Sequence, residues 1–261
     1  MTSEGNVQAA ARRLWQAAER GEPCAPVRDL ITPGDIDAAY RVQMINDQAL
    51  RAKGARPSGR KIGLTSLAVQ KQLGVDQPDF GLIYADREFA DGGAVPFASL
   101  MQPKVEAEIA LVLGADIDVA EPRLADVILA TAYVLPAIEI VASRIANWDI
   151  TLVDTIADNA SFGAYVLGSP VRRLDGLDLK ACTMQLSVNG SIVSRGAGVA
   201  CLGSPLSAAT WLAGKMVSSG APLKAGEVIM TGALGPMASV VIGDQIAAEI
   251  DGLGTVSFRL V

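Results

Sequence analysis

The periodicity of the sequence changes near Lys61, and this change limits the folds that the chain can adopt. Before it, apolar residues recur at helical spacing, as over residues 6–20, and a second helix is expected to end at Gly54. Beyond it, apolar runs are shorter, β-branched residues increase and glycines interrupt them. This order predicts an α+β fold with a curled, barrel-like sheet rather than a doubly wound α/β fold. We expect a helical N-terminal region over 1–60 and a β-rich core over 61–261, built as one continuous unit.

Short local signals place individual elements within these two regions. Thr32-Pro33-Gly34-Asp35 predicts a helix start with Thr32 as the cap. Asn189-Gly190 lies between two strand-like runs and predicts a hairpin, while Ser204-Pro205 predicts the start of a late helix. The other expected elements are a helix over 124–132 and strands over 105–113, 133–141, 162–167, 226–231, 245–250 and 255–260.

The chain contains no histidine, and this absence restricts its chemistry. It excludes a Ser-His-Asp or Cys-His triad and any zinc site with histidine ligands. Acid–base chemistry must then come from carboxylates, lysine, tyrosine, cysteine or metal-bound water. A metal site would be rich in oxygen ligands, which favours Mg²⁺, Mn²⁺ or Ca²⁺.

Charge and hydropathy exclude further classes of function. A net charge of -6 argues against general nucleic-acid binding. No apolar run approaches the roughly 18 residues of a membrane span, and the N-terminus lacks the apolar segment of a secretory signal. The three cysteines are widely spaced, as is typical of reduced cytosolic thiols. We therefore expect a cytoplasmic protein that binds neither nucleic acid nor membranes.

Three glutamates form the sharpest candidate site. Glu106 and Glu108 alternate with apolar residues, so on a strand they would project together from one face. Glu139 lies in an otherwise apolar run, where an unpaired carboxylate costs several kcal/mol. The plainer interpretations are a solvated edge strand for the first two, and an ion pair with Arg144 or Lys104 for Glu139. The functional interpretation is a site for Mg²⁺ or Mn²⁺ with open positions for a chelating substrate.

Other residues also have two interpretations. From pattern alone, Lys61 before an apolar, glycine-containing turn is typical of a surface charge, and Asp79 in Pro-Asp-Phe-Gly is typical of a turn. The loop over 231–237 is either a glycine-rich bend or a set of N–H groups that hold a carboxylate or enolate oxygen. Capping and turn roles are favoured for a polar cluster that comprises Asp154, Asp158, Asn159 and Ser161.

Seven segments in the same order along residues 59–237 together resemble the 2-keto-4-pentenoate hydratases of the fumarylacetoacetate hydrolase superfamily. The segments are GRKIGLTS, QLGVDQPDFG, QPKVEAEIALVL, LPAIEIVASRI, DTIADNAS, CLGSPL and IMTGALGPM. Each segment alone is a weak signal, but the combination is specific. The resemblance implies a helical N-terminal part packed on a β-rich, barrel-like core.

The resemblance also implies roles for individual residues. Glu106, Glu108 and Glu139 would hold Mg²⁺ or Mn²⁺, with no organic cofactor. Lys61 and Asp79 would lie in the pocket, where they are the natural proton carriers in a chain without histidine. The expected substrate-binding residues are Gly63, Thr65, Gln102, Ser161, Thr231 and Gly232.

The implied reaction belongs to the meta-cleavage catabolism of aromatic compounds. Water would add to 2-hydroxypenta-2,4-dienoate, through 2-oxopent-3-enoate, to give 4-hydroxy-2-oxopentanoate. The chain lacks an insertion after Trp148 that hydratases of longer dicarboxylic substrates have, which favours a C5 or C6 substrate. The alternatives are decarboxylation of 2-oxo-3-hexenedioate (4-oxalocrotonate) and a non-catalytic partner subunit. The resemblance further implies a homo-oligomer, such as a pentamer or decamer, and a complex with a decarboxylase or aldolase of the pathway.

Overall fold

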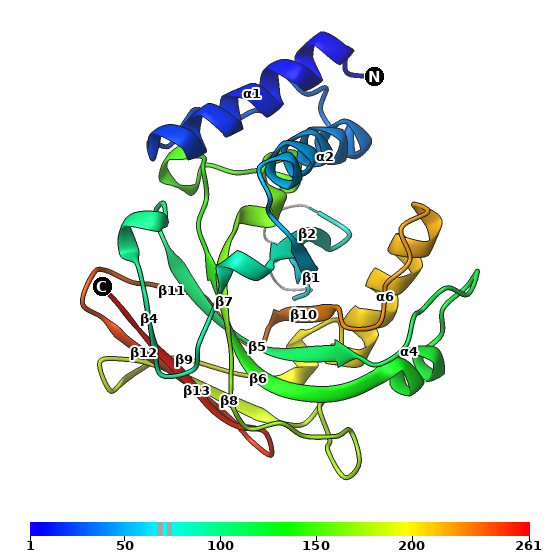
Figure 1. The fold of residues 1–261 in the computed structure, drawn as a ribbon, viewed down its shortest axis with the longest axis vertical. Coiled ribbons are helices and arrows are strands. Elements are labelled where there is room, and N and C mark those ends of the chain that lie inside the picture. The colour runs from blue at the N-terminus through cyan, green and yellow to red at the C-terminus, as the bar shows by residue number, and fades with distance from the viewer. Residues whose placement is uncertain (67–69, 72–74) are drawn as a thin grey trace.

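The computed structural model describes residues 1–66, 70–71 and 75–261, in which helices pack on two β-sheets (Figure 1). The helices are α1 (Glu4–Arg20), α2 (Ile36–Ala52), α4 (Leu124–Ala130), α5 (Leu152–Ala157) and α6 (Pro205–Ser218). The longer strands are β1 (Pro57–Gly63), β2 (Asp79–Tyr84), β5 (Lys104–Leu113), β6 (Thr131–Val141), β7 (Phe162–Leu167), β8 (Thr183–Val188), β9 (Ser191–Ala197), β10 (Val228–Ala233), β12 (Gln245–Ile250) and β13 (Gly254–Leu260). Short elements are the strands β3 (Glu88–Phe89), β4 (Gly93–Val95) and β11 (Ala238–Ser239), and the 3₁₀ turns η1 (Ala85–Arg87), η2 (Phe97–Ser99), η3 (Ala146–Trp148), η4 (Asn159–Ser161) and η5 (Gly198–Ala200).

The two N-terminal helices stack on each other at one side of the molecule, away from the sheet that contains β12 and β13 (Figure 1). Apolar residues of α1, of α2 and of the loop that joins them form a separate core together with Ile145 and α5. The prediction that Thr32 caps α2 is wrong. Asp35 is the cap, because its carboxylate accepts the Ala38 N–H at 3.1 Å, and the Pro-Gly pair lies outside the helix.

The strands of the described residues form an eight-stranded and a five-stranded sheet. The larger sheet has the order β2-β1-β10-β5-β6-β7-β3, with β11 paired to β5, and the smaller has the order β4-β13-β12-β8-β9. Most pairs are antiparallel, while β1/β10, β3/β7 and β4/β13 are parallel. The predicted hairpin is confirmed: Asn189 and Gly190 both have positive φ, as the tight turn between β8 and β9 requires.

The main core lies between the two sheets and under α4 and α6. Val105, Ala107, Ile109 and Leu111 are all buried there, as the alternation along β5 predicts. The α+β class and the mixed sheets therefore agree with the expectation from the sequence. Within the described part of the chain, no helix is long and apolar enough to cross a membrane. The boundary expected near residue 60 stays a prediction.

Candidate active site

The order and register of five neighbouring strands, β2-β1-β10-β5-β6, bring the predicted polar residues to one face of the larger sheet. Side chains two residues apart on a strand share a face, and so do directly paired residues. Glu106 pairs with Glu139 across β5 and β6, and Glu108 lies two residues further along β5. On the other side, Lys61 pairs with Met230 of β10, which in turn pairs with Ala110 of β5. Asp79 completes the set, because it pairs with Gly63, two residues after Lys61.

The three glutamates form a cluster that could hold a cation. One carboxylate oxygen from each of Glu106, Glu108 and Glu139 lies within 4.8 Å of the other two. Glu108 and Glu139 are fully buried and Glu106 is half-buried. Glu108 Oε1 and both oxygens of Glu139 have no hydrogen-bond partner among the described residues. Buried carboxylate oxygens that accept no hydrogen bond are costly. The three carboxylates therefore fit a hard divalent cation, which prefers oxygen ligands.

Lys61 lies inside the same cluster. The residue is 3% exposed, so the surface position that the pattern favoured is wrong. Its Nζ atom lies 3.3 Å from Glu139 Oε1. The two partners suggested for Glu139 from the sequence are also wrong, because Arg144 pairs with Asp158 and Lys104 lies over the Trp148 ring. Lys61 is 78 positions from Glu139 in the sequence and reaches it only through the sheet.

The charges of this site are unbalanced. Lys61 is one ammonium among four carboxylates, so three negative charges are in excess when all are ionised. Burial, and then Glu139, raise the pKa of Glu106 to about 7. Burial is also the largest cause that raises the pKa of Glu108 well above its usual range, and that of Glu139. Burial alone would lower the pKa of Lys61, but Glu139 and Asp79 outweigh it and raise this pKa. A divalent cation would remove most of the excess charge.

Asp79 is buried in a strand and does not form a turn. It begins β2 and is 1% exposed, and its Oδ2 accepts a hydrogen bond from Thr155 Oγ1 at 3.1 Å. Its Oδ1 has no hydrogen-bond partner among the described residues. Burial raises the pKa of this carboxyl group, and Lys61 opposes that rise. A carboxylate whose pKa is raised is a stronger base, which suits proton transfer near neutral pH.

Backbone packing at β10 holds one glutamate in place. The Gly232 N–H donates to Glu108 Oε2 at 2.8 Å, so the structure turns this N–H toward a proposed ligand rather than toward a substrate oxygen. Gly232 has φ +104°, and a Cβ there would lie 2.4 Å from Thr65 Oγ1. The Thr231 hydroxyl donates to the Ile109 carbonyl at 2.7 Å. Glycine is therefore required at residue 232 both by its φ and by the close approach of Thr65.

The remaining expected substrate-binding residues differ in their surroundings. A Cβ at Gly63 would lie 2.2 Å from Asp79 Oδ1, so Gly63 leaves room inside the site. The Ser161 hydroxyl is buried without a hydrogen-bond partner among the described residues, in a turn whose residues 159–161 all have positive φ. By contrast, the Gln102 side chain is engaged with the backbone of residues 143–147 through three hydrogen bonds. Its role with substrate stays a prediction.

Two residues of the site were missed by reasoning from the sequence. Thr155 was not singled out, although it holds Asp79. Cys201 was noted only as a thiol, yet its Sγ lies 3.1 Å from the Gly232 carbonyl, to which it donates. Neither residue stands in a pattern that indicates chemistry, because each acts on a residue that is far away in the sequence.

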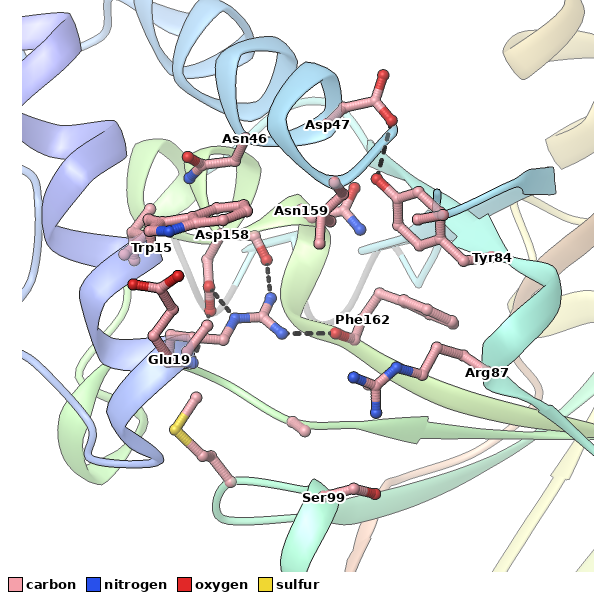
Figure 2. Close-up of a pocket in the computed structure, with 18 of the residues that line it drawn as sticks. Trp15, Glu19, Asn46, Asp47, Tyr84, Arg87, Ser99, Asp158, Asn159 and Phe162 are labelled. Carbon is pink, nitrogen blue, oxygen red and sulfur yellow. Dashed lines mark hydrogen bonds and ion pairs between the residues drawn. The ribbon is translucent and has the colours of Figure 1, made fainter. Parts of the chain in front are cut away.

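A separate cavity of about 420 Å³ lies between the N-terminal helices and the sheet (Figure 2). Trp15 and Asn46 line it from the helices, and Asp158 and Asn159 line it from the turn after α5. The residues that line it include neither Lys61, nor Asp79, nor any of the three glutamates. It is therefore distinct from the carboxylate cluster.

Comparison with known proteins identifies relatives over nearly the whole chain. The chain is 56% identical over 252 residues to 2-keto-4-pentenoate hydratase 1 of Dechloromonas aromatica strain RCB, which covers 97% of this chain and 96% of the relative. It is 53% identical over 256 residues to the 2-keto-4-pentenoate hydratase of Burkholderia vietnamiensis strain G4, which covers 98% of each chain. Both relatives are therefore matched over nearly their full length.

A solved structure has the same fold as this chain over its whole length. The 4-oxalocrotonate decarboxylase from Pseudomonas putida G7, complexed with magnesium and adipate, superimposes with a TM-score of 0.95 at 34% identity, over 100% of this chain and 99% of the other. The family model of the fumarylacetoacetate hydrolase C-terminal domain matches residues 71–261. With the full-length relatives, this match shows that the chain belongs to the fumarylacetoacetate hydrolase family and, within it, groups with the 2-keto-4-pentenoate hydratases.

Proposed function

We propose that the protein is a metal-dependent hydratase that adds water to 2-hydroxypenta-2,4-dienoate and forms 4-hydroxy-2-oxopentanoate. The observation that carries the proposal is the cluster of Glu106, Glu108 and Glu139 beside Lys61 and Asp79, in a chain whose full-length relatives are hydratases. The cluster offers oxygen ligands, and Lys61 and Asp79 offer an acid and a base. A Lewis acid, a general acid and a general base can together catalyse the hydration of a conjugated 2-oxo acid.

The three glutamates would hold the metal, for which Mg²⁺ and Mn²⁺ are the candidates. A bound divalent cation supplies Lewis-acid stabilisation of the negative charge that develops on the C2 oxygen of the substrate. Glu108 is oriented for this role by the Gly232 N–H, and Glu139 by its ion pair with Lys61. Support for a metal comes from Glu108 Oε1 and the two oxygens of Glu139, which are buried and accept no hydrogen bond from the described residues, with Lys61 as the ion-pair partner of Glu139.

Asp79 and Lys61 would carry the protons. In the first step the dienol loses its hydroxyl proton and gains a proton at C5, which gives 2-oxopent-3-enoate. In the second step a water oxygen bonds to C4, one water proton passes to Asp79, and a proton is delivered to C3 by Lys61. The raised pKa of Asp79 favours its role as the base, and the raised pKa of Lys61 keeps it protonated as the acid.

The alternatives are a decarboxylase and a non-catalytic subunit. The decarboxylase structure is 34% identical to this chain, whereas hydratase relatives are 53% and 56% identical, which favours hydration. A non-catalytic subunit has no need of a buried lysine and aspartate beside three carboxylates. We further propose that the protein forms a homo-oligomer.

One assay separates these functions. Purified protein is given the C5 dienol or 2-oxo-3-hexenedioate, each with Mg²⁺ or Mn²⁺, and the products are identified. We expect 4-hydroxy-2-oxopentanoate from the C5 dienol only when a metal is present. Release of CO₂ from the dicarboxylate without hydration of the dienol would instead assign a decarboxylase, and absence of both products would assign a non-catalytic protein.

A further inference from the structure

The two oxygens of the Asp79 carboxylate have different surroundings. Oδ2 accepts the Thr155 hydroxyl at 3.1 Å, whereas Oδ1 is buried and has no hydrogen-bond partner among the described residues. A Cβ at Gly63 would lie 2.2 Å from this Oδ1 and 3.5 Å from Lys61 Nζ. Oδ1 therefore faces the backbone of Gly63, which has no side chain, beside Lys61 Nζ. The bond from Thr155 determines which of the two oxygens is left to act in the site.

The hydroxyl of Thr155 does not bond within its own helix. A helical threonine commonly donates to the carbonyl four residues earlier, as Thr210 does in α6 at 2.7 Å. In α5 that carbonyl belongs to Thr151 and accepts the Thr155 backbone N–H at 3.0 Å. The hydroxyl instead reaches across to Asp79, 76 positions away in the sequence. This orientation gives Thr155 a specific partner in the site.

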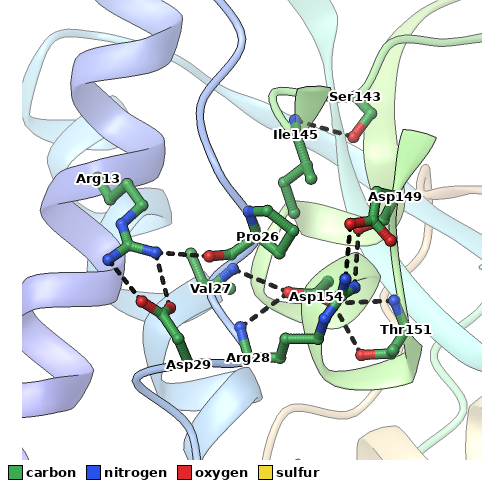
Figure 3. Close-up of polar contacts among 10 residues, drawn as sticks. All are labelled: Arg13, Pro26, Val27, Arg28, Asp29, Ser143, Ile145, Asp149, Thr151 and Asp154. Atoms are coloured by element: carbon green, nitrogen blue, oxygen red, sulfur yellow. Dashed lines mark hydrogen bonds and ion pairs between the residues drawn. The ribbon is translucent and has the colours of Figure 1, made fainter. Parts of the chain in front are cut away.

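A buried carboxylate fastens α5 to the N-terminal region. Asp154 Oδ1 accepts the backbone N–H groups of Val27 and Arg28 at 2.8 and 2.9 Å (Figure 3). Its Oδ2 accepts the Arg28 guanidinium at 2.9 Å and the Thr151 N–H and hydroxyl at 2.9 and 2.8 Å. Five donors on one fully buried carboxylate hold α5, and with it Thr155, in a single orientation.

A second contact joins α5 to the strand that carries Asp79. The buried Gln43 of α2 donates its Nε2 to the Ile156 carbonyl at 3.0 Å and to the Phe80 carbonyl at 3.0 Å. Ile156 follows Thr155, and Phe80 follows Asp79. One amide group therefore fixes the distance between the two backbones whose side chains form the Thr155–Asp79 bond.

We propose that Thr155 is a positioning residue for hydration, which holds Oδ2 of Asp79 so that Oδ1 receives the proton of the attacking water. The N-terminal region serves this purpose in two ways, because Asp154 fastens α5 to residues 27 and 28 while Gln43 of α2 ties α5 to β2. This inference rests on the proposed function, since it requires Asp79 to be the base. It adds a residue that acts through Asp79 and is not among the proposed metal ligands.

The test compares Thr155→Val, which keeps the shape of the side chain, with Thr155→Ser, which keeps the hydroxyl. Thr210→Val is the matched control, because it removes a hydroxyl hydrogen bond from another helix. We expect Thr155→Val to lower kcat for hydration about tenfold, the effect of losing one hydrogen bond to a charged group, with KM within about twofold. Thr155→Ser should recover most of kcat, and loss of the dienol by ketonisation should change less than hydration.

Two further measurements make the result decisive. The shift in melting temperature on adding Mg²⁺ should be the same in Thr155→Val and in the wild type, since no metal ligand changes. In an Asp79→Asn background Thr155→Val should have no further effect on kcat, because the two residues act through the same hydrogen bond. If the valine protein is unstable, Thr155→Ala is the second variant.

The outcomes also separate this inference from the proposed function. If the wild type forms no 4-hydroxy-2-oxo acid, the proposed function fails. If the wild type is active but Thr155→Val behaves like Thr210→Val, only the positioning role is overturned. Additive losses in the Asp79→Asn background, or equal losses in the valine and serine variants, would overturn it as well.

Discussion

Replacing Glu106 with glutamine should stabilise the metal-free protein at about pH 8 and weaken its response to Mg²⁺. The pKa of Glu106 is raised from 4.5 to about 7 in the folded protein, by burial and then by Glu139. Between about pH 4.5 and about pH 7, the folded chain therefore keeps a proton on Glu106 that the unfolded chain has released. The free energy of unfolding must fall as the pH rises from about 4.5 to about 7, and the full loss is present above that window.

The size of the effect follows from the pKa shift. A shift from 4.5 to about 7 corresponds to roughly 3 kcal/mol. Glu106 is only half-buried, so solvent screening reduces this, and we expect about 1 to 2 kcal/mol. For a chain of this length, that is a rise in melting temperature of roughly 2 to 8 °C in Glu106→Gln at about pH 8. At about pH 5, where the wild-type carboxyl group is already protonated, the two proteins should melt at nearly the same temperature.

Melting curves measured by scanning calorimetry, with a chelator or with Mg²⁺, at both pH values test this reasoning. Mg²⁺ should raise the melting temperature of the wild type at the higher pH, and much less that of Glu106→Gln, because a ligand is lost. Glu249→Gln is the control, since Glu249 is an exposed strand residue outside the site. A Glu106→Gln protein that was no more stable than the wild type without metal, and that responded equally to Mg²⁺, would refute the reasoning.

Three other predictions concern the base, the glycine of β10 and the assembly. Asp79→Asn should lower hydration by about 10²- to 10⁴-fold and leave the Mg²⁺-induced shift in melting temperature intact; near wild-type formation of the 4-hydroxy-2-oxo acid would remove Asp79 from the mechanism. Gly232→Ala should destabilise the protein by about 1 to 3 kcal/mol in urea unfolding, because φ is +104° and the new Cβ would meet Thr65. Gly243→Ala, which has φ +90° but open space around it, should cost less, and equal losses would show that the contact with Thr65 does not matter. Light scattering at micromolar concentration should give several times the monomer mass of 27.1 kDa, and a value near 27.1 kDa would contradict a homo-oligomer.

The features that the sequence determined by itself are those that depend on local spacing. A strand alternates its side chains whatever it pairs with, so Glu106 and Glu108 were predicted on one face, opposite the buried apolar residues of β5. The Asn189-Gly190 hairpin and the late helix from Pro205 were predicted for the same reason, because turn and cap residues act on their immediate neighbours. The absence of histidine left carboxylates, lysine and oxygen-ligated metals as the chemistry to look for.

Only the tertiary structure decided how these pieces meet. From its neighbours along the chain, Lys61 resembled a surface charge. In the structure β10 lies between β1 and β5, and this strand order brings Lys61 next to Glu139. The bond from Thr155 to Asp79 likewise joins residues 76 positions apart and depends on Asp154 to hold α5. Local propensity is set by a residue and its nearest neighbours, whereas burial and partners are set by packing between distant segments. The sequence therefore determined which groups could act, and the order of the strands decided which of them act together.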